Sequence, residues 1–267
     1  HKTHVLLYGG HDPGVCASSH LMQSQWYLGH LEQAANSAQE TLASAEKLGH
    51  PMTLILAHFF TSYYYLLCRD ATVARQQAEI CIALSQEHGV LNYGSLGNAV
   101  HGWATAVEGD LENGVAEISK GLAAWQRTGA GLRVPEFLAV LAEVQGWAGR
   151  PEQGLESITE ALRLVEATGE KKCLAEIIRI KGGLLMLQPE ENTDASEECF
   201  NLALKIARQQ QAKMLELRAA VSLARIQAGT GRHDEARGVL STIYEWFTEG
   251  LDTPDLRDAK ALLDELK

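Results

Sequence analysis

The sequence predicts an all-α fold, a solenoid of about six antiparallel helix pairs that has a 40-residue period and ends in a capping helix. Two observations lead to this prediction. A glycine recurs at a fixed interval, and small and large apolar residues recur in columns at the same interval. A period between about 20 and 50 residues is typical of solenoids. The composition agrees, because 46% of the 267 residues are hydrophobic and only 6 are prolines that could interrupt helices.

Glycine recurs every 40 residues at the end of a long helical pattern, at Gly49, Gly89, Gly129 and Gly169. Glycine in this place takes the left-handed conformation that stops a helix. A second series of helix ends lies midway between these positions, at Gly29, Arg69, Gly109, Gly149 and then Pro189. Each repeat is therefore predicted to be a helix, a turn, a second helix and a turn.

Columns of small and large residues repeat with the glycines. Small residues let helix axes approach, and large apolar residues fill the layer between them. Two extra residues near 189–192 shift the frame by two. In the first helices, the small column is Met22, Ser62, Gly102, Ala142, Gly182 and Ala224. The second helices have two columns of mostly small residues, which are Ala34, Ala74, Gly114, Gly154, Ser196 and Ala236, and seven residues later Thr41, Cys81, Gly121, Ala161, Ala203 and Ile243. Between these two columns lies a column of mostly larger residues, which begins at Ala38 and ends at Leu240.

These columns define the expected elements. A single domain over 1–267 should contain six units and a cap, whose Thr253-Pro254 start combines an N-cap residue with proline at the first helical position. The units are expected at 13–49, 51–89, 91–129, 131–169, 171–211 and 212–250, and the cap at 253–267. First helices are expected at 13–28, 51–68, 91–108, 131–148, 171–187 and 212–229, and second helices at 31–48, 71–88, 111–128, 151–168, 193–210 and 232–248.

The small-large-small pattern resembles the tetratricopeptide (TPR) repeat. The glycine-or-alanine column of that family corresponds here to the column of Gly102 and Ala142, and its two alanine columns correspond to those of Ala34 and Ala161. The period is 40 rather than 34 residues, and the proline that usually ends the second helix is missing. The helices should therefore be about one turn longer, as in the TPR-like, MalT-type sensor domains of large bacterial signalling ATPases.

Three stretches narrow the resemblance: 8–16, 122–129, and 246–256 followed by 259–266. Together they resemble the C-terminal region of bacterial proteins that join a class III adenylate or guanylate cyclase domain, a STAND-type ATPase and a TPR tail. The resemblance implies a cytoplasmic sensor or scaffold segment for signal transduction, with other domains of a parent chain beside it. No residue of this chain inherits the cyclase or ATPase roles.

The net charge and the cysteines indicate the class of partner and the cellular compartment. The net charge of −11 repels phosphate backbones, so nucleic acid is not expected as a partner. The five cysteines are odd in number and never form a Cys-x-x-Cys pair, which predicts buried thiols in the cytoplasm. The chain begins at His1 without a signal peptide or Met, so we expect a piece of a longer protein.

The segment 51–68 contains no Asp, Glu, Lys or Arg and is long enough to begin to span a bilayer. It also contains a histidine, several hydroxyl groups and three tyrosines, and it falls in register with the repeats. We therefore expect a buried solenoid helix and no membrane partner.

No catalytic or cofactor-binding motif is found. The phosphate-loop, dinucleotide, nucleophile-elbow and His-Glu-x-x-His patterns are all absent, so no enzyme activity and no cofactor are expected. His1, His4 and His11 lie near one another, but a zinc site needs three or four convergent ligands, so no metal is expected. His58 and His101 are expected to be packed or groove histidines.

A groove on the concave side, lined by the first helices, is the expected site. In the resembling family, ligand contacts come from positions one residue after and three before the small residue. An aromatic wall in the second and third units and a basic end would provide the usual binding hot spots. The alternative is that the aromatic residues pack between helices. The expected groove residues are Ser19, Gln23, Phe59, Tyr63, Trp103, Glu143, Arg179 and Arg225, with Gly183 at an equivalent position.

The leading functional hypothesis is a protein- or peptide-binding scaffold or sensor. One alternative is a small-molecule effector site, as in the tail of the maltose-regulon activator, which would need a deep pocket with convergent polar groups. Another alternative is a structural spacer or self-association module. A peptide binder should instead show an open, extended groove.

Overall fold

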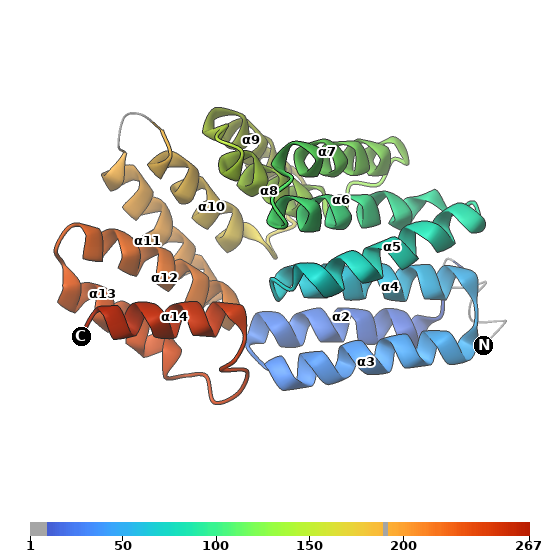
Figure 1. Ribbon diagram of the computed structural model, residues 1–267, viewed down its shortest axis with the longest axis horizontal. Coiled ribbons are helices and arrows are strands. Elements are labelled where there is room, and N and C mark those ends of the chain that lie inside the picture. Colours follow the sequence, from blue (N-terminus) through green and yellow to red (C-terminus); the bar gives the residue numbers. More distant parts are fainter. Residues whose placement is uncertain (1–9, 189–191) are drawn as a thin grey trace. The chain divides into compact units, whose positions relative to one another are not determined.

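The computed structural model describes residues 10–188 and 192–267, and these residues form thirteen α-helices and no strand, as predicted. Pairs of helices are joined by turns of a few residues (Figure 1). The helices are α2 (Pro13–Leu28), α3 (Leu31–Leu48), α4 (Pro51–Leu67), α5 (Ala71–Glu87), α6 (Leu91–Val107), α7 (Leu111–Arg127), α8 (Val134–Trp147), α9 (Pro151–Thr168), α10 (Leu174–Met186), α11 (Thr193–Gln209), α12 (Lys213–Gly229), α13 (His233–Tyr244) and α14 (Pro254–Glu265).

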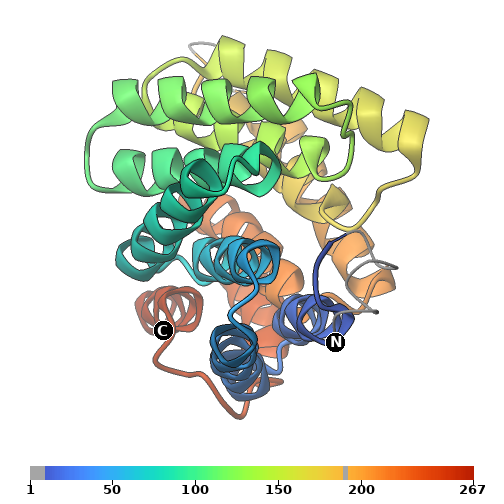
Figure 2. The same ribbon diagram turned by 90° about the vertical axis from the view of Figure 1, so that its right-hand side faces the viewer.

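The chain divides into two compact units. Unit 1 comprises the described residues up to Trp26 together with His30–Gly131, and unit 2 comprises Tyr27–Gly29 and Leu132–Lys267. The expectation of one domain over 1–267 stays a prediction. In each unit a first helix contacts its own second helix and the next first helix, as α4 contacts α5 and α6, and α10 contacts α11 and α12. Within unit 1, successive pairs are rotated relative to one another, since α2 and α3 are seen nearly end-on in Figure 2 whereas α6 and α7 run across the view.

The predicted helix ends are confirmed. Gly49, Gly89, Gly129 and Gly169 all have positive φ, between 58° and 82°. The midway series behaves in the same way even where it lacks glycine, because Arg69 has a φ of 59°. The periodic stop is therefore a property of the backbone at these positions. Pro189 lies outside the described residues.

The small columns mark the closest helix contacts, as predicted. A Cβ atom at Gly102 in α6 would lie 2.9 Å from the carbonyl oxygen of Gly114 in α7 and 2.9 Å from the amide nitrogen of Ile118. A Cβ atom at Gly114 would in turn lie 2.8 Å from the carbonyl oxygen of Gly102. Only glycine allows backbones to approach this closely.

Three helix boundaries differ from those expected by three residues or more. α8 and α10 each begin three residues late, at Val134 and Leu174. In the first case Arg133, with a φ of 68°, closes a turn before the helix can begin. α13 ends at Tyr244, before the expected boundary at 248. The cap helix α14 contacts both α12 and α13, so it occupies the place of a further first helix.

The uncharged segment forms α4, most of whose side chains are buried. Among the described residues, no helix combines the length and the apolar character that crossing a membrane requires.

All five cysteines are free thiols. Cys81 and Cys173 are buried, as expected, whereas Cys16, Cys68 and Cys199 are half-buried. Burial raises the pKa of the Cys81 thiol to about 12 and raises the pKa of Cys173 as well. Both buried thiols are therefore protonated near neutral pH, where only the thiolate reacts.

Candidate functional site

The groove residues expected in unit 1 are buried. Tyr63 is 1% exposed and Trp103 is 4% exposed, and Ser19, Gln23 and Phe59 are equally inaccessible. That these five residues contact a ligand stays a prediction. Their burial favours the alternative in which the aromatic residues pack between helices.

Aromatic rings join the first helices of unit 1. The Phe59 ring of α4 stacks on the Tyr93 ring of α6 with 5.3 Å between centroids, and on Tyr63 at 6.5 Å. Tyr93 continues the series to Trp125 of α7 at 6.0 Å. The Phe60 ring lies 6.2 Å from the Tyr93 ring between centroids. We call Phe59, Phe60, Tyr63, Tyr93 and Trp125 the aromatic seam. Such ring pairs contribute about 0.5–1.5 kcal/mol each beyond the area that they bury.

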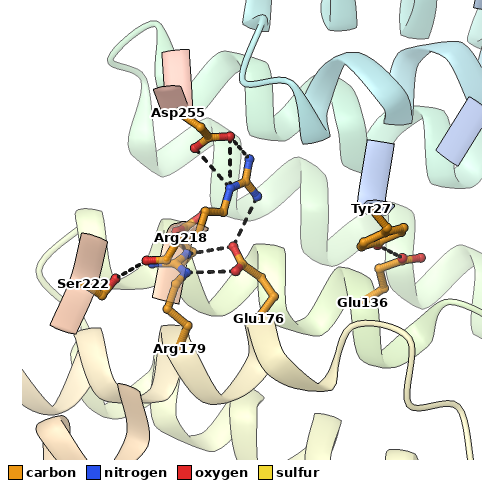
Figure 3. Close-up of polar contacts among 8 residues, drawn as sticks. Tyr27, Glu136, Glu176, Arg179, Arg218, Ser222 and Asp255 are labelled. Carbon is orange, nitrogen blue, oxygen red and sulfur yellow. Dashed lines mark hydrogen bonds and ion pairs between the residues drawn. The ribbon is translucent and has the colours of Figure 1, made fainter. Parts of the chain in front are cut away.

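Ion pairs join the first helices of unit 2. Arg179 of α10 donates to Glu143 of α8 at 2.8 Å and to Glu176 of its own helix at 2.8 Å. Arg218 of α12 lies 3.4 Å from Glu176 and donates to Asp255 of α14 at 2.8 Å. We call these five residues the charge ladder. Figure 3 shows Arg179 and Arg218 converging on the Glu176 carboxylate, with Asp255 beyond Arg218.

The charge ladder keeps its guanidinium groups ionised. Burial by itself would lower the pKa of Arg179, but the carboxylates of Glu176 and Glu143 outweigh it and raise the pKa. Burial likewise opposes the charge of Arg218, and Asp255 and Glu176 raise its pKa. The ladder contains three carboxylates and two guanidinium groups, so its ionised form carries a charge of −1.

The other groove residues expected in unit 2 lie on an accessible face. Arg225 of α12 is 56% exposed and pairs with Asp258 of α14. At Gly183 of α10, an added Cβ atom would meet no atom within 4 Å. The Ser222 hydroxyl, one turn before Arg225, donates to the carbonyl of Arg218 (Figure 3). We call Glu143, Arg179, Gly183, Ser222 and Arg225 the first-helix strip.

The structure therefore joins two expected residues, Glu143 and Arg179, and separates Arg225 from that contact. Glu176, Arg218 and Asp255 are functional candidates that were not predicted from the sequence. Two spacings could have revealed Glu176 and Arg218. Glu176 and Arg179 are three residues apart, and Arg218 precedes Arg225 by seven residues, so each pair shares one helix face.

Metal binding has no candidate site in the part of the chain that the structure describes. Within it, no group of three or more His, Cys, Asp or Glu side chains is arranged to hold a metal ion. His1 and His4 lie outside the described residues. His58 hydrogen bonds Gln77 at 2.8 Å, and burial lowers its pKa, as expected of a packed histidine. The absence of enzyme activity stays a prediction.

Comparisons with known proteins identify the fold. No family model matches the chain. An uncharacterized protein of Rhizobium meliloti (strain 1021) is 27% identical over 227 residues, which make up 84% of this chain and 22% of that protein. The chain thus spans about a fifth of the length of this curated relative.

Two solved structures have a similar fold. The crystal structure of NprR in complex with its cognate peptide NprX matches 94% of this chain and 69% of its own, with a TM-score of 0.68 and 12% identity. A STAND protein with a tetratricopeptide repeat sensor from Pyrococcus horikoshii matches 95% of this chain and 38% of its own, with a TM-score of 0.52 and 16% identity. The predicted TPR-like fold is confirmed, whereas the finer resemblance to cyclase-containing proteins stays a prediction.

Proposed function

We propose that this chain is a peptide- or protein-binding sensor segment and that its ligand binds along the first-helix strip of unit 2. Two observations support the proposal: the open space at Gly183 of α10, and the exposed guanidinium of Arg225 on α12, the first helix that α10 contacts. The TPR-like neighbour NprR, which was crystallised with its cognate peptide, supports the ligand class.

The first-helix strip contains one arginine that is held in place, Arg179, and one whose ion pair a ligand can replace, Arg225. Arg179 is fixed by two carboxylates from two helices, so its position is set before a ligand arrives. Arg225 pairs with Asp258, whose side chain is 36% exposed. Exposed ion pairs contribute about 0–1 kcal/mol, so a ligand carboxylate can replace Asp258 at little cost. The ligand is therefore a peptide with an acidic side chain or a free C-terminal carboxylate near Arg225.

The segment is proposed to serve a longer cytoplasmic signalling protein. This part of the proposal rests on the resemblance to the C-terminal region of cyclase and STAND ATPase proteins, and the likeness to a STAND protein with a TPR sensor supports it. Peptide binding would then be the input, and the output would belong to other domains of the parent chain.

A peptide-library selection tests the proposal. Phage that display random 12-residue peptides are selected on the purified 267-residue chain, and the affinities of the selected peptides are measured by calorimetry. Gly183→Leu should weaken binding at least tenfold, because the new side chain fills the open space of the strip while improving helix propensity by roughly 1 kcal/mol. Arg225→Ala should weaken binding of acidic peptides by about tenfold, a typical loss for one charge-assisted hydrogen bond.

Matched controls lie on a second helix. Gly238 of α13 also borders open space, so Gly238→Leu makes the same chemical change away from the strip and should leave affinity unchanged. Arg237→Ala on the same helix controls for net charge. Selected peptides that bind the Gly183→Leu and Arg225→Ala variants as tightly as the parent chain would refute the strip as the site.

A further inference from the structure

A cleft in unit 1 lies between α5, α6 and α7. Its volume is about 290 Å³, and its polar lining includes Glu79 of α5, Asn98 and His101 of α6, and Glu117 of α7. Every residue that lines it belongs to unit 1, so it is separate from the first-helix strip. None of the eight expected ligand contacts lines this cleft, whereas His101, which was expected to be a packed or groove histidine, does.

His101 lies between two carboxylates from different helices. Its Nδ1 is 2.7 Å from Oε2 of Glu117, and its Nε2 is 3.6 Å from Oε1 of Glu79. The side chains of Glu79, Glu117 and His101 are 55%, 38% and 22% exposed, so a ligand can reach all three. In the tautomer that carries its proton on Nδ1, His101 donates to Glu117, and its Nε2 is an acceptor that faces a second acceptor, the Glu79 carboxylate.

The distance between these two acceptors suits a third group. A donor nitrogen about 2.8–3.0 Å from both Nε2 and Oε1 fits between them, because hydrogen bonds of that length can meet at one nitrogen when the acceptors are 3.6 Å apart. A primary ammonium or a guanidinium has enough N–H groups to donate to both acceptors.

Among the described residues, no lysine or arginine lines the cleft. Arg75 lies one turn before Glu79 on α5, but its Nε donates to Glu108 at 3.0 Å and its second nitrogen also binds that carboxylate. Asn98 uses its amide nitrogen within its own helix, donating to Gly94 at 2.9 Å. The cleft therefore presents the carboxylates of Glu79 and Glu117 to solvent, with the side-chain amide of Gln86 also in its lining.

The cleft also has an apolar part. Ile82 and Ala83 of α5 line it beside the polar groups. Methylene groups can pack on these side chains while a charged end remains among the carboxylates, which is how long basic side chains behave at protein surfaces. Carboxylates alone would make only an acidic patch, but a hollow with an apolar wall and an oriented histidine selects an aliphatic chain that ends in a cation.

We infer that this cleft is a second binding site and that it takes the cationic end of a lysine or arginine side chain from a partner polypeptide. The net charge of −11 steers such a partner toward the chain. The inference does not depend on the first-helix strip, so either site can fail without the other.

Methyl NMR on the full chain tests the inference. Isoleucine δ1 methyl groups are labelled, and the Ile82 resonance is assigned by its loss in Ile82→Val. The probes are a blocked pentapeptide, acetyl-Gly-Ala-Lys-Ala-Gly-amide, its arginine and norleucine counterparts, and the free diamine cadaverine. The lysine and arginine peptides should shift the Ile82 resonance saturably, with a dissociation constant in about the millimolar range. The norleucine peptide, which keeps the four carbons of the lysine side chain but lacks the ammonium group, should not. Glu79→Gln should weaken binding about tenfold, because it removes one charge-assisted contact.

The control variant is Glu87→Gln, two turns further along α5, which changes net charge equally and should leave affinity within twofold. An equal loss in Glu79→Gln and Glu87→Gln would overturn the site, since attraction to overall charge would then explain binding. Equal shifts by the norleucine and lysine peptides would overturn recognition of a cation. Shifts by cadaverine alone would assign the same chemistry to a free diamine and overturn the polypeptide partner. The absence of any shift up to about 20 mM, far above the expected dissociation constant, would overturn the inference as a whole.

Discussion

Unit 1 and unit 2 share one repeat but join their first helices by different chemistry. In unit 1 the aromatic seam fills the space between α4 and α6, and in unit 2 the charge ladder connects α8, α10, α12 and α14. Apolar burial is favourable without regard to direction, whereas buried ion pairs stabilise little relative to apolar packing but require particular partners. This difference shows that the repeat determines where the helices contact one another. The side chains at the contact positions then determine whether the face of the first helices is filled by packing or is left open to solvent.

The largest effect is expected in the aromatic seam. Phe59 is fully buried and contacts rings on two helices, so Phe59→Ala should lower the free energy of unfolding by about 3–5 kcal/mol. Urea unfolding followed by circular dichroism measures this loss, which should be almost independent of salt. A loss below about 1 kcal/mol would mean that the seam does not hold unit 1 together.

In the charge ladder, stability should be lost because a buried charge is left without its partner. Arg218→Ala leaves Asp255, which is 5% exposed, and Glu176 without their shared partner, so it should cost about 3 kcal/mol. The double variant Arg218→Met with Asp255→Leu should recover most of that stability, because it removes the stranded charge as well. If the double variant unfolds as easily as the single one, packing rather than charge explains the effect.

The small column allows the two units to be compared at one position. At Gly102 an added Cβ atom would meet backbone atoms of α7 at 2.9 Å, whereas at Gly182 it would meet the Phe200 side chain at 2.6 Å. Backbone cannot move aside as a ring can, so Gly102→Ala should cost about 1–3 kcal/mol and Gly182→Ala should cost about 1 kcal/mol or less. Thermal unfolding of the two variants side by side tests the order, and the reverse order would contradict the comparison.

The smallest effect is expected at the exposed end of unit 2. Asp258→Asn removes the partner of Arg225, and the free energy of unfolding should fall by less than about 1 kcal/mol. The difference between the variant and the parent chain should shrink at 1 M salt, where exposed charges are screened over about 3 Å. A loss comparable to that of Arg218→Ala would show that the pair is part of the ladder and is not free to accept a ligand.

Much of the fold could be predicted because its signals are local. A helix stop depends on the backbone of a few residues, so Gly49 and Gly89 mark their turns in the sequence, and Arg69 takes the left-handed conformation because the repeat requires it. The late starts of α8 and α10 escaped prediction because the preceding turns, such as the one at Arg133, depend on contacts such as that of its amide with Glu170.

The candidate site shows where sequence reasoning ends. Tyr63 and Arg225 hold the same place in the repeat, one residue after the small column, yet Tyr63 is 1% exposed and Arg225 is 56% exposed. The sequence by itself determined the period, the helix ends and the shared face, because each depends on spacing within a helix. Only the tertiary structure decided which of these positions is open, because exposure depends on side chains that neighbouring helices bring into contact.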